Sequence, residues 1–164
     1  MQMTSRIATV ADAERIASIY NQGIAERIAT FETEPRSTAD LEEQIRYKGE
    51  RFPTIVLEAD GDLIAFATAG PYRLRACYGG IAEHSVYVDQ AHRGKGAGRF
   101  ALTALCDEYA RLGFWKLLSR IFPENVASLR LHEQCGFRVV GTYERHARLD
   151  GQWRDCVIVE RLLI

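Results

Sequence analysis

The chain has 164 residues, of which 47% are hydrophobic, and this size and composition suit a single domain, residues 1–164, around one buried core. A formal net charge of −1 and a sequence pI near 6.4 exclude the strongly basic surface that dominates nucleic-acid binding, so we expect no nucleic-acid partner. No apolar run approaches the roughly 20 residues of a membrane span, and the first residues lack a long apolar segment, so we expect a cytoplasmic protein with no membrane partner.

The first segment of the chain predicts a strand followed by a helix. Residues 6–8 are β-prone, and Thr9 with Asp12 three residues later is typical of a helix N-terminus. Apolar residues then recur at helical spacing, namely Ile16, Ile19, Tyr20 and Ile24. A strand followed by a helix begins an α/β pattern.

A loop and a hairpin follow. Residues 30–38, TFETEPRST, are rich in turn formers, and Thr38 is the expected cap of a second helix. Residues 54–70 hold two β-prone runs joined by Asp60-Gly61, which is a strong hairpin signal. An antiparallel pair of strands is therefore expected here.

The second half of the chain alternates strands and helices more regularly. We expect a strand over residues 81–88, a helix from about 96 to 112, a strand over 116–122 and a helix that ends at Gly136. Two last strands flank the turn signal at residues 149–152. The predicted fold class is α/β (α+β), with a mixed, mostly antiparallel central sheet and helices on both faces.

A glycine loop lies between the strand at 81–88 and the helix after it. Residues 92–99, HRGKGAGR, hold three glycines beside basic side chains, and backbone N–H groups at a helix start suit a phosphate-bearing ligand. A strand-to-helix turn that binds no ligand would have the same pattern of residues. A dinucleotide-binding unit is disfavoured because Glu124, the first acid after the next strand, lies 26 residues beyond Gly98. A Walker loop is excluded because Lys95 is followed by Gly96.

Two motifs together point to a family. Arg93-x-x-Gly96-x-Gly98, after the strand SVYV, resembles the phosphate loop of the GCN5-related N-acetyltransferases (GNAT), whose pattern is Arg/Gln-x-x-Gly-x-Gly/Ala. Residues 125–137 resemble that family's second cofactor segment. The resemblance covers nearly the whole chain and implies a GNAT fold with acetyl-CoA as co-substrate. It also implies the cofactor-binding residues Val86, Tyr87, Val88, Arg93, Gly94, Lys95, Gly96, Ala97, Gly98, Arg99, Asn125 and Ser128.

Four short stretches resemble a narrower branch, the phosphinothricin and arsinothricin N-acetyltransferases. These stretches are ATFETEPRS, AGPYRLRACY, AEHSVYV and DGQWRDCVIVERL. The likeness implies acetylation of the α-amino group of a toxic, glutamate-like amino acid, which gives resistance, and it implies a homodimer. The sequence departs from this branch at Tyr78-Gly79-Gly80, where those enzymes carry bulkier aromatic residues ending in Trp-Thr.

The chemistry implied by the resemblance needs a base and a donor for negative charge. An incoming ammonium must lose a proton, and Glu83 on the expected central strand is the candidate general base, acting directly or through water. A solvated strand residue or an ion-pair partner is the alternative. His84 is expected to face the other way with a structural role. Backbone N–H groups near Val86 to Val88 would stabilise the developing oxyanion.

The expected second cofactor segment supplies the other catalytic candidate. His132 stands where many members of this superfamily have a tyrosine that protonates the departing thiolate, and the phosphinothricin branch resembles this chain in having histidine. Helix capping or packing is the alternative. Asn125 and Ser128 would hydrogen-bond the pantetheine arm, although the same residues also read as a helix start.

Two loops supply candidates for acceptor binding. Arg73 and Arg75 alternate before the central strand, and guanidinium groups suit a carboxylate or phosphinate. Exposed arginines are the alternative in a chain with 18 Arg and three Lys. Phe31 and Glu34 would line the entrance, with Glu34 attracting an ammonium, unless they belong to a solvated loop.

Other functions remain open on the sequence alone. The acceptor could be another amine, such as methionine sulfoximine, a polyamine or a protein N-terminus, or the chain could be a CoA-binding sensor without turnover. The paired arginines Arg73 and Arg75 argue against a polycationic acceptor, because like charges repel.

Four dispersed cysteines without a CxxC pair indicate no metal and no disulfide, so we expect them to pack as apolar side chains. Trp153 and Asp155 are expected to stabilise the last strands or a dimer contact.

Overall fold

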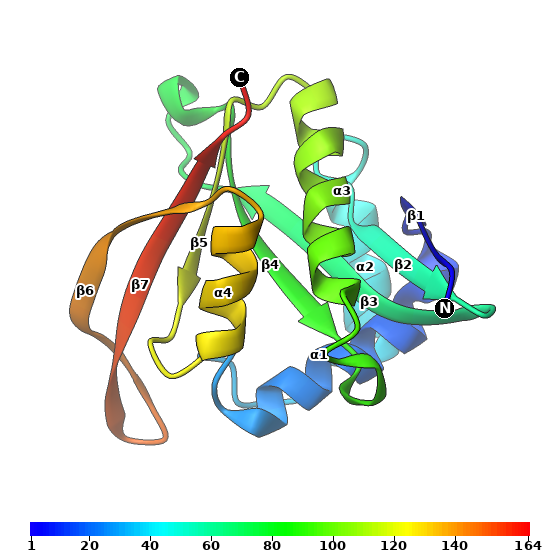
Figure 1. The fold of residues 1–164 in the computed structure, drawn as a ribbon, viewed down its shortest axis with the longest axis horizontal. Coiled ribbons are helices and arrows are strands. Elements are labelled where there is room, and N and C mark those ends of the chain that lie inside the picture. The colour runs from blue at the N-terminus through cyan, green and yellow to red at the C-terminus, as the bar shows by residue number, and fades with distance from the viewer.

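The structure is a computed structural model that describes residues 1–164, and it confirms a mixed sheet flanked by helices (Figure 1). Seven strands lie in the order β1-β2-β3-β4-β5-β7-β6, and only β4 and β5 pair in parallel. The strands are β1 (Met3–Ile7), β2 (Ile55–Ala59), β3 (Asp62–Pro71), β4 (Ile81–Val88), β5 (Lys116–Ile121), β6 (Arg138–Leu149) and β7 (Gln152–Leu162). The helices are α1 (Ala13–Glu26), α2 (Thr38–Lys48), α3 (Ala97–Arg111) and α4 (Val126–Gln134), with 3₁₀ turns η1 (Val10–Asp12), η2 (Ala76–Tyr78) and η3 (Gln90–His92).

The helices cover both faces of the sheet, as the sequence predicts. Helices α3 and α4 lie on one face, and α1 and α2 lie on the other (Figure 1). The larger core cluster packs α3 on the sheet and includes Leu102, Leu105 and Tyr109, all fully buried. A second cluster packs Ile16 and Ile19 of α1 on the opposite face. Each such side chain contributes about 1.5–3 kcal/mol by leaving water. None of the helices has the length and apolar character needed to cross a membrane.

The helix starts agree with the sequence in one case and correct it in the other. Thr9 and Asp12 form the expected capping box, with the Thr9 N–H donating to the Asp12 carboxylate at 2.8 Å. The second helix is capped by Ser37, not by Thr38: the Ser37 hydroxyl accepts from the Asp40 N–H at 3.0 Å. Asp40 decides this register, because it is three residues after Ser37 and returns a bond to the Ser37 N–H.

The predicted hairpin is confirmed. Asp60 and Gly61 both have positive φ, 53° and 80°, which a two-residue turn of the primed type requires. This turn joins β2 and β3 in an antiparallel pair. The pair then places β3 beside β4, the strand that carries the candidate base.

Strands β4 and β5 separate along their length. Only three residue pairs join them, from Ile81↔Lys116 to Glu83↔Leu118, although β4 continues to Val88. The two arrows diverge below this point, and α4 lies over the gap (Figure 1). Backbone groups of β4 beyond Glu83 therefore have no ladder partner in β5, and the Ser119 hydroxyl bonds one of them, the His84 carbonyl, at 2.8 Å.

Candidate active site

Two cavities lie on opposite faces of the sheet and meet where β4 and β5 separate. One, of about 470 Å³, lies between the glycine loop, α4 and β4, and we call it the glycine-loop cavity. The other, of about 290 Å³, lies under α1 and α2, and we call it the α1/α2 cavity. A pocket of about 30 Å³ between them shares Ala29 and Tyr87 with both. Ligands held in the two cavities would meet across this gap in the sheet.

The glycine-loop cavity collects almost all of the predicted cofactor residues. Its lining includes Val86, Tyr87, Val88, Arg93, Gly94, Gly96, Ala97, Gly98, Arg99, Asn125 and Ser128, and lacks only Lys95 from the predicted set. Gly94 and Gly96 have φ of 75° and 84°, a conformation that glycine adopts without strain. The loop opens into the N-terminus of the 15-residue helix α3. A pyrophosphate suits this cradle, because the first N–H groups of a helix have no intrahelical partner and the loop glycines carry no side chains.

Arg93, a predicted cofactor-binding residue, lines the glycine-loop cavity and forms an ion pair within the chain. Its guanidinium binds both carboxylate oxygens of Glu26 in α1, at 2.7 and 2.6 Å, and its Nε donates to the Val88 carbonyl at 3.2 Å. Arg93 lowers the pKa of Glu26, chiefly by hydrogen bonding. In this structure Arg93 joins α1 to the glycine loop, and Arg99 and Arg130 are the lining cations without a carboxylate partner.

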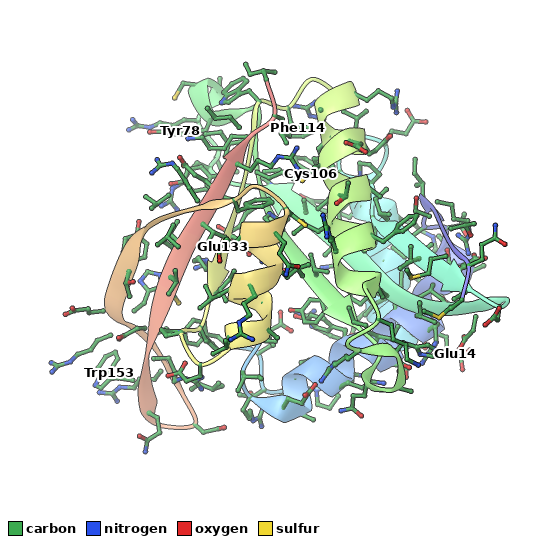
Figure 2. All side chains as sticks on the ribbon, in the orientation of Figure 1. Glu14, Tyr78, Cys106, Phe114, Glu133 and Trp153 are labelled. Carbon is green, nitrogen blue, oxygen red and sulfur yellow. The ribbon has the colours of Figure 1, made fainter.

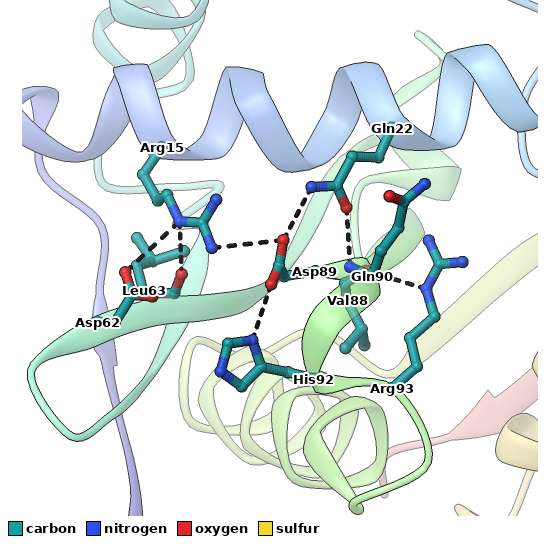
Figure 3. Close-up of polar contacts among 9 residues, drawn as sticks. All are labelled: Arg15, Gln22, Asp62, Leu63, Val88, Asp89, Gln90, His92 and Arg93. Carbon is teal, nitrogen blue, oxygen red and sulfur yellow. Dashed lines mark hydrogen bonds and ion pairs between the residues drawn. The ribbon is translucent and has the colours of Figure 1, made fainter.

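A buried carboxylate fixes the start of the loop. Asp89, directly after β4, accepts hydrogen bonds from Gln22 at 2.8 Å and His92 at 2.7 Å, and Arg15 lies at 3.4 Å (Figure 3). Gln22 also accepts from the Gln90 N–H at 2.9 Å. These bonds lower the pKa of Asp89, with Gln22 the largest cause. The loop is thus held against α1 by side chains on both sides of it.

The α1/α2 cavity contains the predicted base. Glu83 lines it with a side chain 30% exposed, and Arg120 donates to its Oε2 at 2.7 Å. Glu83 is therefore an ion-pair partner, as the alternative interpretation of the sequence expected, but its second oxygen, Oε1, has no hydrogen-bond partner. Glu83 stands opposite Gly70 of β3, where an added Cβ would meet nothing within 4 Å. The space beside the carboxylate is open to an acceptor.

His132 lies beside a second histidine. Its Nε2 is 2.9 Å from Nε2 of His84, and its Nδ1 is 2.7 Å from the Ser128 carbonyl. Because a carbonyl only accepts, His132 carries its proton on Nδ1, and His84 must donate from Nε2. Burial lowers the pKa of both rings, and their mutual repulsion adds to the effect on His84, so both are neutral.

This arrangement refines the expectations for both histidines. His84 does lie on the face opposite Glu83, as predicted, but it directly contacts the candidate acid instead of serving only the core. Its Nδ1 is buried and has no hydrogen-bond partner. The sequence analysis missed this pair because the two residues are 48 positions apart.

The structure separates the four acceptor candidates. Phe31 lines the α1/α2 cavity, with its ring edge against Phe122 at a centroid distance of 4.7 Å. Glu34, Arg73 and Arg75 are exposed and line none of the cavities described above. The two arginines lie in a loop that turns into η2 instead of running extended, so they do not form the expected aligned pair. Their role in binding an acid stays a prediction.

Several residues of the α1/α2 cavity were missed by the sequence analysis. Glu32, not Glu34, lines the cavity, and Arg36 binds its two carboxylate oxygens at 2.8 Å. Arg120 and Lys48 also line it. The spacing of Glu32 and Arg36 was a readable signal, whereas nothing local to Arg120 or Lys48 pointed to the cavity.

Other expectations are corrected or clarified by packing. Three cysteines are buried as expected, but Cys77 is exposed. Tyr78-Gly79-Gly80, the departure from the branch pattern, lies outside the α1/α2 cavity, and the Trp115 ring covers Gly80 so closely that an added Cβ would be 2.1 Å from it. No group of three or more His, Cys, Asp or Glu side chains could hold a metal ion.

Two adjoining cavities, one suited to phosphate groups and one lined by a carboxylate, are typical of a group-transfer enzyme. The chain matches the acetyltransferase (GNAT) family over residues 20–137, well over half of its length. It belongs to that family and is an acetyltransferase.

Named relatives extend over the whole chain. The L-methionine sulfoximine/L-methionine sulfone acetyltransferase of Salmonella typhimurium is 33% identical over 162 residues, covering 96% of this chain and 93% of that protein. The phosphinothricin N-acetyltransferase of Streptomyces viridochromogenes is 31% identical over 150 residues, covering 92% and 82%. A crystal structure of a GNAT superfamily phosphinothricin acetyltransferase from Sinorhizobium meliloti in complex with AcCoA has a TM-score of 0.89 at 31% identity, covering 99% and 89%.

These comparisons confirm the predicted family and the GNAT fold, and they confirm acetyl-CoA as the donor at the level of the family. The relatives act on amino acids, but their named acceptors differ. Similar identities, 33% and 31%, link this chain to a sulfoximine enzyme and to a phosphinothricin enzyme. Overall identity therefore does not select the acceptor.

Proposed function

We propose that this chain transfers an acetyl group from acetyl-CoA to the α-amino group of a small, glutamate-like toxic amino acid such as phosphinothricin or arsinothricin, and so gives resistance. The observation that carries the proposal is the position of Glu83, in a cavity that adjoins the glycine-loop cavity at the separation of β4 and β5. Relatives that acetylate phosphinothricin support the acceptor class.

Glu83 would act as the general base. Arg120 holds Oε2 at 2.7 Å and leaves Oε1 free to take a proton from the acceptor ammonium, directly or through one water. The neutral amine would then attack the acetyl group. Acetyl-CoA, when bound, supplies this group in activated form.

The opening in the sheet would stabilise the charge that develops during transfer. Backbone N–H groups among Val86 to Val88 lie beyond the last β4–β5 pair, at the wall shared by the cavities. Fixed backbone donors are effective there because they need no reorganisation. Asn125 accepts from the Ser128 N–H at 3.2 Å, so the helix-start reading of this pair holds while both residues also face the donor cavity.

His132 would return a proton to the departing thiolate. Both of its ring nitrogens are engaged, so it must exchange a hydrogen bond with Ser128 or His84 before it donates. His84 holds the His132 ring in place through Nε2 and keeps its own proton. His132 would then take up a proton from solvent, so that the ring is neutral again before the next turnover.

The test is acetyl-CoA-dependent thiol release by the purified protein with phosphinothricin, arsinothricin, methionine sulfoximine, glutamate and spermidine. Turnover restricted to the glutamate-like toxins supports the proposal. Preference for spermidine or for methionine sulfoximine would replace the acceptor class. Binding of acetyl-CoA without turnover of any amine would favour the sensor alternative.

We also propose that the chain forms a homodimer through β6 and β7. Apolar side chains are exposed there, with Val139 at 60%, Tyr143 at 51% and Trp153 at 53%, and Trp153 projects from the β6–β7 ribbon (Figure 2). An exposed apolar edge of this kind favours association. Light scattering of wild type and Val139→Lys tests this: a dimer that the substitution dissociates supports it, and a wild-type monomer refutes it.

A further inference from the structure

Lys48 is a half-buried cation that lines the α1/α2 cavity and has no carboxylate partner. It is the last residue of α2, and its ammonium donates to the Thr68 hydroxyl at 2.6 Å, which in turn lies 2.9 Å from the Thr54 hydroxyl. Burial lowers the pKa of Lys48 to about 8. Partly removing an ammonium from water without giving it a carboxylate partner is unfavourable, so its position in a cavity requires a reason.

Lys48 differs in this respect from the other cations of the α1/α2 cavity. Arg36 is bound through two hydrogen bonds to Glu32, and Arg120 is bound to Glu83. Those two guanidinium charges are therefore already neutralised within the chain. An ammonium has three donors, and only one of them is used at Lys48.

The sheet register places this ammonium at a useful distance from the candidate base. Thr68 of β3 stands opposite Ser85 of β4, and Glu83 is two residues from Ser85 on the same face. Such diagonal neighbours are roughly 7–8 Å apart. A compact acceptor can therefore place its amine at Glu83 and a second group, a few bonds away, at Lys48.

We propose that Lys48 binds the distal acidic group of the acceptor. The cavity would then select side chains that end in a carboxylate or phosphinate over neutral sulfone or sulfoximine side chains of similar size. This inference rests on the proposed function, because it assigns the substrate class of the same site. It gives the acid a partner inside the cavity, where Arg73 and Arg75 do not lie.

The first experiment compares Lys48→Met with wild type on phosphinothricin, which is anionic, and on methionine sulfone, which is neutral at that end. Methionine keeps the length of the side chain, and Thr68 and Thr54 still satisfy each other. Loss of a charged hydrogen bond predicts a fall in kcat/KM for phosphinothricin of about 10- to 100-fold, mainly through KM. The value for methionine sulfone should stay within about threefold.

Arg46→Met is the matched control, since it removes an exposed cation of the same helix that lines neither cavity. It should leave both substrates unchanged. Equal losses for both substrates in Lys48→Met would assign Lys48 a structural role and overturn the inference. No loss for either would remove Lys48 from the acceptor site.

A second experiment does not depend on turnover. The chain has three lysines, Lys48, Lys95 and Lys116, so modification by acetic anhydride can be followed at each by peptide mass spectrometry. N-acetylphosphinothricin, which has no free amine, should protect Lys48, whereas N-acetylmethionine sulfone should not. Absence of protection overturns the inference even in an active enzyme. Protection without acetylation of any amino acid would refute the proposed function and leave the binding site standing.

Discussion

The two cavities are built by different means. The glycine-loop cavity presents backbone N–H groups, held by the positive φ of Gly94 and Gly96 and by the start of α3. The α1/α2 cavity presents charged side chains from separate elements, including Lys48 and Glu83. A backbone site keeps its chemistry when side chains change, whereas a side-chain site changes with each substitution. If the proposed function holds, acceptor specificity resides on the α1/α2 face and donor binding resides on the other.

The largest test of this division is Glu83→Gln on the acceptor face. Loss of a positioned base should lower kcat by about 10²–10⁴-fold and leave the affinity for acetyl-CoA unchanged. Steady-state kinetics and calorimetry with CoA measure the two quantities. Glu42→Gln, on α2 outside both cavities, is the control. An unchanged kcat would remove Glu83 from the base role.

The matching test on the donor face changes the backbone. Gly96→Ala forces a side chain into a φ of 84°, which costs on the order of 1–2 kcal/mol and displaces the loop. The Kd for CoA should rise about tenfold, with kcat at saturation retained. Gly113→Ala is the matched control, because Gly113 has φ of 92° at the far end of α3 and lines neither cavity. Equal effects of both variants on the Kd for CoA would refute the claim that the backbone of the glycine loop binds the donor.

The smallest predicted effect concerns the histidine pair between the cavities. Burial lowers the pKa of His84 and His132, so only the unfolded chain takes up protons as the pH falls through about 6.5. Stability is therefore lost as the pH falls below that value, by on the order of 1 kcal/mol between pH 7.5 and 6.0. Urea unfolding at the two pH values measures it.

The double variant His84→Leu/His132→Met should remove most of this pH dependence, since neither new side chain titrates. His146→Gln is the control, because that histidine is exposed. If the double variant keeps the wild-type dependence on pH, other groups cause it and the neutral pair is not its source.

The fold and the conformation of the glycine loop were predictable because their signals are local. Asp60-Gly61 specifies its turn through two adjacent residues, and the glycine loop brings its donors together within eight positions. Both the turn and the loop can be predicted without knowledge of the tertiary structure. The one-residue error at the second helix, Thr38 in place of Ser37, arose because both residues are good caps and only Asp40 distinguishes them.

The acceptor site could be predicted only in part because its residues converge from distant segments. Glu83 was found from its place on the central strand, but its partner Arg120 is 37 residues away. Lys48 meets Thr68 only because α2 ends against β3. Arg73 and Arg75 were predicted to point the same way along an extended segment, and the turn into η2 prevents this arrangement. Long-range packing, which the sequence does not display, decides each case.

The Glu26–Arg93 pair has a consequence for the order in which substrates bind. It connects α1, which covers the acceptor face, to the loop that would receive the donor phosphates. A phosphate that drew Arg93 away from Glu26 would release one attachment of α1, and thermodynamic linkage then requires each substrate to alter the affinity of the other equally. The two binding equilibria would be coupled across the sheet, and the strength of that coupling would depend on one guanidinium.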